Sequence, residues 1–506
     1  MKRSLSCLVF LLIVSFPALA QKITYSETDK EDNRDIRFEV LGKVGEHYLV
    51  YKNVRWKHIV QVFDKEMKSL NNERMKFIPD KTFNADFVVY PDHVVMIYQY
   101  QKNNIVYCKA VKLDQDANPV GDEIMLDTTK ISLLTSNKIY STTFSEDKKK
   151  ILLYKLQTKN NRMGMLLKRF DSDIKMLDST RFYIPFDDRR DVYSDFDISN
   201  DGTIVFLKET TTNFRDNVNN LEITTLPLRS DSFISRPVEL GDKYIDEVVL
   251  KIDNLNQNYL VNAFYFAQKR AGSVQGLFSA IVDKSDLSVR RAFNVFSDSL
   301  RSKISNSGQF RFAFDDMFVR NIFLKRDGSY LLVAEDFSQT RSGNNFNRWD
   351  YLYNSPYNFN SDYYFSNRSN YGYGYYRPYN SYSNIQSIRY DYDNVMIAGL
   401  DSSLNLQWST IINKKQSDYD TDNFLSYATM NSGAEIHFLF IEKERNSQII
   451  SDQSINPLGA LTRYPTLKSR EAGYQFMPKL GKQVGVRTMI IPCIYRGYIA
   501  FAKVDF

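Results

Sequence analysis

The chain alternates apolar and polar residues in short runs that end at an aspartate, and a polar turn and a second run follow each aspartate. Alternation with a period of two indicates strands with one buried face. The first two intervals between these aspartates are 50 and 57 residues, and the later ones are about twice as long. A fixed period in an all-strand pattern predicts a repeat architecture. The recurring aspartates are Asp64, Asp114, Asp171, Asp283, Asp401 and Asp505.

Each repeat has room for four strands. The first two are expected to form a hairpin, because Asn200-Asp201-Gly202 and Arg326-Asp327-Gly328 place Asp-Gly turns between alternating runs. The third strand ends at the recurring aspartate, whose carboxylate is expected to accept backbone N–H groups of the next turn. Units of about 50 residues with four strands predict an all-β fold, a single β-propeller.

The repeat count favours eight four-stranded blades, and seven is the alternative if one unit is a pair of extra hairpins. The fourth unit has Leu228-Arg229 where the aspartate belongs, and the seventh is poorly defined. The expected units are 36–80, 82–130, 137–187, 191–240, 243–296, 316–413, 420–468 and 472–506.

The two chain ends predict how the ring closes. The last unit stops after the strand Tyr498 to Val504 and lacks a fourth strand, whereas Lys22 to Ser26 is an unpaired alternating run before the first unit. Open sheet edges are a liability. We therefore expect the N-terminal strand to complete the last blade.

Residues 1–20 have the pattern of a signal peptide. Lys2 and Arg3 precede the apolar run Leu5 to Phe16, and Ala18-Leu19-Ala20 fits a cleavage site. The mature propeller domain is then 21–506, exported to the periplasm or outer-membrane periphery of a Gram-negative bacterium. No other run is long enough to span a membrane, so the mature chain is expected to be soluble or peripherally associated with the outer membrane.

Composition excludes some partners. The formal charge of +6 falls to +4 without Lys2 and Arg3, which is too small and too evenly mixed in sign to indicate nucleic acid. Two cysteines follow the signal, Cys108 and Cys493. They occur in strands of units that are not consecutive, so free buried thiols are the favoured interpretation and a disulfide is the alternative.

The segment 338–388 interrupts the sixth unit. It holds 11 Tyr, 10 Asn and 9 Ser in 51 positions, too little aliphatic surface to offset the cost of ordering, so we expect a disordered or loosely packed insertion. It is either a tolerated low-complexity insertion or a partner-binding loop. In the second case the anchoring residues would be Trp349, Tyr363, Tyr364, Tyr375 and Tyr376.

The sequence offers little catalytic chemistry. Four scattered histidines and the absence of Cys-x-x-Cys, G-x-S-x-G and phosphate-loop motifs lead us to expect no metal, cofactor or catalytic set. Asp197 to Gly202 matches half of a calcium loop, but Lys208 stands where a carboxylate is required, so a hairpin turn is favoured. Equivalent positions in successive units make the recurring aspartates structural turn residues.

The run Leu400-Asp401-Ser402-Ser403-Leu404-Asn405-Leu406-Gln407-Trp408-Ser409 resembles the strand-turn-strand of exported β-propellers of the WD-repeat-like and quinoprotein-like type. The resemblance implies a platform for partners. The Thr-Gly of the quinoprotein turn is absent, so no quinone cofactor is expected.

The leading hypothesis is a non-catalytic scaffold or accessory subunit of an envelope assembly or secretion machine that binds an envelope protein or glycan. The alternative is a polysaccharide-active hydrolase or lyase, or a glycan-binding protein.

Overall fold

Strands make up most of the described chain, as the alternation predicts. The computed structural model describes residues 22–131, 138–213, 216–270, 272–304, 312–341, 348, 387–444, 447–467 and 473–506. The helical elements described along their full length are α1 (Asp298–Ile304) and two 3-10 turns, η1 (Asn33–Asp35) and η3 (Pro478–Leu480). None of the described helices has the length and apolar character needed to cross a membrane.

The first three units each form a four-stranded antiparallel sheet in chain order. Their strands are β2 (Ile36–Val44), β3 (His47–Val54), β4 (Lys57–Phe63), β5 (Ser69–Asn71), β6 (Thr82–Val89), β7 (Val94–Lys102), β8 (Ile105–Leu113), β9 (Pro119–Lys130), β10 (Ser141–Phe144), β11 (Lys150–Lys159), β12 (Arg162–Asp171) and β13 (Met176–Pro185).

The next two units are joined into one eight-stranded sheet, because β16 pairs with β18 at Val218 and Ile245. Its halves also pack face to face through a shared apolar cluster. Hydrogen bonding therefore gives seven sheets in the described ranges, and the count of eight blades stays a prediction. The strands are β14 (Asp191–Ile198), β15 (Ile204–Thr211), β16 (Val218–Leu226), β17 (Ile234–Pro237), β18 (Tyr244–Asp253), β19 (Asn258–Phe266), β20 (Gly276–Asp283) and β21 (Val289–Val295).

In two of the last three units, two short strands together occupy one edge of the sheet. In the sixth unit, β25 and β26 both pair with β24, and in the last unit, β31 and β32 both pair with β33. The strands are β22 (Met317–Leu324), β23 (Tyr330–Arg341), β24 (Ile388–Leu400), β25 (Leu406–Ile412), β26 (Gln416–Tyr419), β27 (Tyr427–Asn431), β28 (Ile436–Glu444), β29 (Ser447–Ile455), β30 (Leu461–Leu467), β31 (Tyr474–Phe476), β32 (Lys482–Gly485), β33 (Thr488–Tyr495) and β34 (Tyr498–Asp505).

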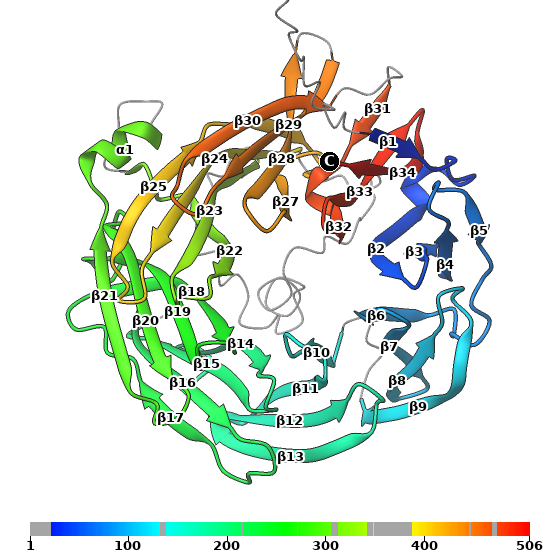
Figure 1. The fold of residues 1–506 in the computed structure, drawn as a ribbon. Helices are drawn as coiled ribbons and strands as arrows, with labels where there is room; N and C mark the ends of the chain where they lie inside the picture. Colours follow the sequence, from blue (N-terminus) through cyan, green and yellow to red (C-terminus); the bar gives the residue numbers. More distant parts are fainter. Residues whose placement is uncertain are drawn as a thin grey trace, which may run out of the picture.

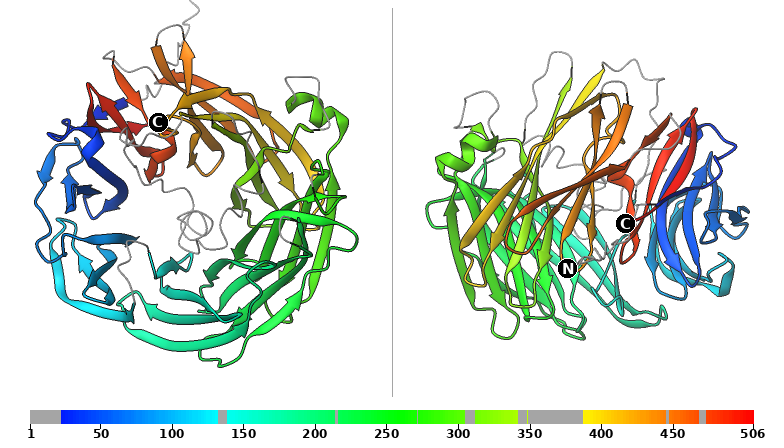
Figure 2. Two further views of the ribbon diagram at one scale, coloured as in Figure 1. Left: turned by 180° about the vertical axis from the view of Figure 1, so that it is seen from behind. Right: turned by 45° about the horizontal axis from the view of Figure 1, so that its top comes forward.

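The sheets stand in a ring (Figure 1), with strands such as β2, β6, β10 and β22 on its inner side and β5, β9, β13 and β21 on its outer side. Figure 2 shows the same ring from behind and tilted, with the red C-terminal strands beside the blue N-terminal ones. This arrangement confirms the predicted all-β, propeller-like fold.

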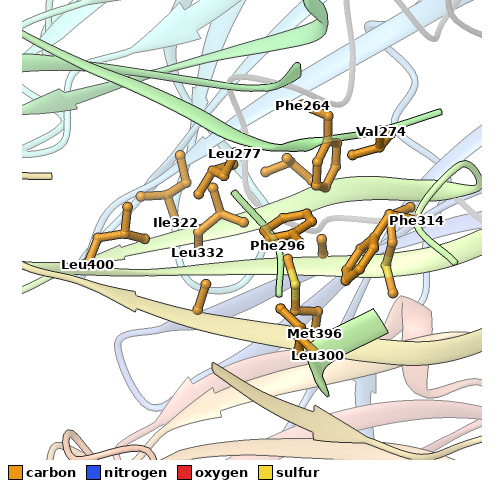
Figure 3. Close-up of a cluster of buried hydrophobic side chains, with 14 of the residues drawn as sticks. Phe264, Val274, Leu277, Phe296, Leu300, Phe314, Ile322, Leu332, Met396 and Leu400 are labelled. Carbon is orange, nitrogen blue, oxygen red and sulfur yellow. The ribbon is translucent and has the colours of Figure 1, made fainter. Parts of the chain in front are cut away.

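The apolar core lies between neighbouring units. Figure 3 shows the cluster between the fifth and sixth units, which gathers Phe264 of β19, Leu332 of β23, Met396 of β24 and Leu300 of α1, with Phe296 between Phe264 and Met396. An equivalent cluster joins the first unit to the last, packing Phe38 of β2 with residues of β33 and β34. The apolar contacts therefore run around the ring and across its closure.

The N-terminal strand β1 (Lys22–Tyr25) closes the ring, as predicted. It pairs antiparallel with β34, from Lys22 opposite Asp505 to Tyr25 opposite Ala502. The backbone N–H of Asp29 then donates to the Ile499 carbonyl at 2.7 Å. The Asp29 carboxylate meets Lys52 Nζ of β3 at 2.5 Å, with exposed side-chain fractions of 9% and 2%. Burial lowers the pKa of Lys52, and the Asp29 charge opposes that shift.

Deleting residues 21–28 should expose the edge of β34 and lower the free energy of unfolding by several kcal/mol, because a ladder of backbone hydrogen bonds and its apolar cover are lost. Thermal melting and the soluble fraction on expression would measure this. The control Arg34→Ala, which breaks an exposed ion pair with Asp32, should leave the melting temperature nearly unchanged. An unchanged melting temperature and solubility in the deletion variant would contradict this role of β1.

Gly328 in the turn between β22 and β23 should resist substitution. Its φ is +78°, and Asp327 Oδ1 accepts the Ser329 N–H at 3.0 Å in the same turn. Gly328→Val forces a branched side chain into the left-handed region, so we expect a loss of about 1–3 kcal/mol in chemical denaturation. Gly328→Asn should cost clearly less, since Asn tolerates this region. Equal losses in the two variants would mean that backbone strain is not the cause.

Candidate functional site

Five of the recurring aspartates lie at the ends of third strands, each followed by a separate turn, whereas Asp505 is a strand residue of β34 that lies opposite Lys22 of β1 and Thr488 of β33. In four of the turns, one carboxylate oxygen accepts the backbone N–H groups two and four residues later, at 2.8–2.9 Å. The four are Asp64, Asp114, Asp171 and Asp401. Because they belong to different units, they do not form one site.

The residue three positions after each of these aspartates is left-handed and apolar. Leu404, for example, has φ +70° and is buried. A non-glycine residue in this region costs about 1–2 kcal/mol, which the two carboxylate hydrogen bonds and burial of the side chain offset. The same combination recurs in each turn of the set: Met67, Ala117, Ile174 and Leu404.

The other two positions differ. At the end of β20, Asp283 accepts from the Ser285 N–H and hydroxyl of the following turn. Asp505, predicted as a turn residue, instead lies in β34 and accepts from the Thr488 hydroxyl of the neighbouring strand β33 at 2.9 Å. In the seventh unit, Asn456 accepts the N–H groups of Leu458 and Ala460. An Asn in place of Asp explains why the sequence repeat was poorly defined there.

The fourth unit, which has no aspartate at this position, is supported from its neighbour. Asp178 Oδ2 of β13 accepts the Arg229 N–H at 3.0 Å. Arg169 of β12, which is buried, donates to the carbonyls of Leu226 and Gly202 at 3.0 and 2.8 Å. The preceding unit thus supplies what the missing aspartate does elsewhere.

The aromatic residues proposed for partner binding lie outside the described residues: Trp349, Tyr363, Tyr364, Tyr375 and Tyr376. The ends of the 338–388 insertion do not match the expected loose packing. Residues 338–341 extend β23, and the ladder continues until Arg341 pairs with Ile388 at the start of β24. The ends of the segment alternate and pair as strands, so the sheet extends further into the insertion than its composition indicated.

Between Arg341 and Ser387 of the insertion the structure describes Arg348, and this residue forms a site that the sequence did not predict. Its Nε donates to Asp246 Oδ2 at 2.7 Å, and its Nη2 contacts Asp246 Oδ1 at 3.1 Å and Glu247 Oε2 at 3.0 Å. Its Nη1 donates to the Met317 carbonyl. The guanidinium carbon lies 4.2 Å from the centre of the Phe318 ring. The site therefore combines carboxylates of β18 with the start of β22.

Glu247 belongs to a pair of acids at strand bulges. Glu247 and Asp195 have φ values of 49° and 51°, and each lies where the register of an inner strand shifts. Each carboxylate accepts a backbone N–H from the inner strand of the next unit: Glu247 from Val319 at 3.1 Å, Asp195 from Leu250 at 2.7 Å. These charges therefore link neighbouring units.

A buried ion pair continues this polar region. Lys414 Nζ lies 2.8 Å from Glu335 Oε1, and both side chains have essentially no exposed surface. Glu335 Oε2 also accepts from the Ser426 hydroxyl at 2.7 Å, and Lys414 donates to the Tyr392 carbonyl at 3.0 Å. Burial lowers the pKa of Lys414, and the nearby carboxylates oppose the shift. The ion pair lies within the sixth unit, and the Ser426 hydroxyl, directly before β27, connects it to the seventh.

Carboxylates gather beside this pair. Burial raises the pKa of Asp336 to about 7, and the charges of Asp316 and Asp393 add to the rise. Burial also raises the pKa of Asp393, against the charge of Lys414. Asp336 is half-buried, so it is the member of this group suited to hold a proton near neutral pH.

Other chemistry is sparse in the described part of the chain. No group of three or more His, Cys, Asp or Glu there is arranged to hold a metal ion. Cys108 and Cys493 are free and buried, as interpreted from the sequence, and burial raises the pKa of both thiols. Asp246 and Glu247 can bind a guanidinium cation, and Asp336 can hold a proton.

Two features of the sequence relate to this site. Asp246-Glu247 is a pair of consecutive acids inside an apolar strand, and Arg348 is one of few cations in an insertion rich in Tyr, Asn and Ser. Buried acids need a partner. That reasoning would have selected the acids without naming Arg348.

Asp336→Asn and Asp401→Asn should change stability in opposite directions. Because the pKa of Asp336 is raised in the folded state, its ionisation destabilises the fold as pH rises from about 4 to about 7. Asp336→Asn should therefore raise the melting temperature most above pH 7 and little below pH 4.

Turn N–H groups lower the pKa of Asp401, so Asp401→Asn should be less stable than the parent at pH 7, with a difference that shrinks in acid. Melting curves from pH 3 to 9 test both, and equal curves for parent and Asp336→Asn above pH 7 would contradict the assignment.

No family model and no curated protein matches the chain. Among solved structures, it is similar to prolyl oligopeptidase B from Galerina marginata, with 7% identity and a TM-score of 0.41, over 92% of this chain and 56% of that one. It is similar to the polysaccharide lyase Uly1, with 8% identity and a TM-score of 0.35, over 83% and 89%. It is also similar to the Synechocystis apocarotenoid oxygenase, with 9% identity and a TM-score of 0.32, over 96% and 93%. The chain spans little more than half the length of the oligopeptidase, and likenesses this distant assign it neither a family nor an activity.

Proposed function

We propose that this chain is a non-catalytic scaffold, exported to the periplasm or outer-membrane periphery of a Gram-negative bacterium. It acts as an accessory subunit of an envelope assembly or secretion machine. The insertion between β23 and β24 presents the binding surface, and the partner is an envelope protein or a glycan.

The observation that carries this proposal is how the inner-strand charges are used. Asp195 and Glu247 accept backbone N–H groups of the next unit, and Glu335 is paired with Lys414. Groups engaged in this way hold the ring together, and they are not poised as a nucleophile with its base. The ring is then a rigid support, and binding is left to what it carries.

The position of the insertion supports the same proposal. It extends from a hairpin whose ladder is paired up to Arg341 and Ile388. A hairpin end tolerates added residues without disturbing the sheet. Tyr and Trp side chains supply large contact area at low entropic cost, which suits a binding loop.

A second candidate rests on Asp336. Its raised pKa, beside Asp316 and Asp393, is a property of general acids. A polysaccharide hydrolase or lyase would use such a group, with a second carboxylate about 5 to 9.5 Å away. Loss of activity toward an acidic or neutral polysaccharide in Asp336→Asn, with the fold intact, would favour this candidate over the scaffold. A glycan-binding protein, in contrast, would retain polysaccharide binding in that variant.

Replacing residues 349–386 by a flexible linker of about ten residues should leave the ring folded and abolish partner capture. The linker begins after Arg348, so the ion pairs of that residue are kept. Melting temperature measures the ring, and pull-down from envelope extracts of the source bacterium measures capture. A variant with unchanged capture would contradict the binding role of the insertion.

A point variant and its control sharpen this test. Serine at all five predicted anchors should abolish capture as the linker does, since interface energy concentrates in a few aromatic residues. Serine at Tyr183 and Tyr419, which are 66% and 60% exposed on the ring, should leave capture unchanged. The five anchors are Trp349, Tyr363, Tyr364, Tyr375 and Tyr376.

A further inference from the structure

The contacts of Arg348 have the form of a built receptor for a guanidinium group. Two of its nitrogens meet the two carboxylate oxygens of Asp246, at 2.7 and 3.1 Å. One of them also meets Glu247 at 3.0 Å, and a third nitrogen donates to the Met317 carbonyl. The planar group lies 4.2 Å from the Phe318 ring centre. A fork of donors and a flat face are what arginine offers and lysine lacks.

The receptor belongs to the ring, and the guanidinium does not. Asp246 and Glu247 are on β18, and Met317 and Phe318 begin β22. Arg348 comes from the insertion, 102 positions after Asp246. The receptor would therefore keep its shape whichever segment supplied the arginine.

The receptor also requires a cation. Asp246 and Glu247 are only 4% and 3% exposed, and buried carboxylates that lose their partner are strongly destabilising. Glu247 in addition holds the Val319 N–H that links two units. An incoming arginine can take the place of Arg348 in one exchange, which leaves the carboxylates paired before and after.

We propose that Asp246, Glu247 and Phe318 form an arginine-binding site for a peptide segment of a partner, and that Arg348 occupies this site in cis and competes for it. The exchange with a partner rests on the scaffold function proposed above, and the site itself does not. The site adds chemistry to that function, because the partner's segment must present an arginine.

The first test uses the full chain with Arg348→Ala, in which the receptor is empty. Methylguanidine at millimolar concentration should raise the melting temperature of this variant toward that of the parent. Methylammonium at the same concentration should not, and neither compound should affect the parent, whose site is filled. Arg389→Ala is the matched control: it removes a 46% exposed arginine that pairs with Asp391 beside the insertion, and methylguanidine should not rescue it. Equal effects of the two compounds on Arg348→Ala would overturn the proposal.

The second test uses a fluorescent peptide of residues 344–351, Asn-Asn-Phe-Asn-Arg-Trp-Asp-Tyr. It should bind Arg348→Ala at least about tenfold more tightly than the parent, where Arg348 competes. A peptide with citrulline in place of arginine should not bind, and Asp246→Asn added to Arg348→Ala should abolish binding. Equal binding of the arginine and citrulline peptides would refute a guanidinium site.

A variant that keeps a charge covers the case in which Arg348→Ala does not fold. Arg348→Lys retains a cation but lacks the fork, so methylguanidine and the arginine peptide should both displace its lysine and raise its melting temperature. Failure of both to do so would overturn the proposal. Guanidinium rescue without any captured envelope partner would contradict the scaffold function and leave the site intact, so the two failures are distinguishable.

Discussion

The pairing of β1 with β34 is the interaction on which the rest of the ring depends. Other sheets are built mainly from consecutive strands, whereas this one joins residues 22–25 to residues 502–505. Without it, β34 would present an open row of backbone donors and acceptors. Closure also buries Lys52 against Asp29, and an ion pair taken out of water is stable only in a well-defined geometry. The N-terminal segment is therefore held by two interactions, the strand pairing of β1 with β34 and the ion pair of Asp29 with Lys52.

Closure fixes the spacing of the inner strands, and the links between units depend on that spacing. Glu247 reaches the Val319 N–H only because β18 and β22 stand at a set separation, and Asp195 reaches Leu250 in the same way. Each acid lies at a bulge with a positive φ, a strained conformation that persists only where its surroundings hold it. A ring that opened would lose these contacts along with its apolar clusters.

The sequence was informative wherever both partners of an interaction lie within a few residues. Asp401 and the left-handed Leu404 are three positions apart, so the whole turn lies in one short stretch of sequence, and its recurrence marks the repeat. The pairing of the chain ends was also predictable, because an unpaired strand and an incomplete unit leave one solution. The repeat was lost where another residue took over the role of the aspartate: Asn456 offers the same acceptor oxygen, and Asp178 reaches in from the preceding unit. In the first case another residue type stands at the same position, and in the second the carboxylate comes from a distant part of the chain. Neither case preserves an aspartate at the repeating position.

The candidate site could not be predicted because its partners are far apart in the chain. No local pattern relates Asp246 to Arg348, and composition marked the insertion only as difficult to order. Burial of an ion pair is weak evidence for a stabilising role, since apolar residues of similar volume are often as good or better. Stability alone therefore gives no reason to place two buried carboxylates on β18 and to satisfy them from an insertion outside the ring. A requirement to bind, release and rebind a guanidinium group does give such a reason, because it needs a receptor that is costly to leave empty and specific for what fills it.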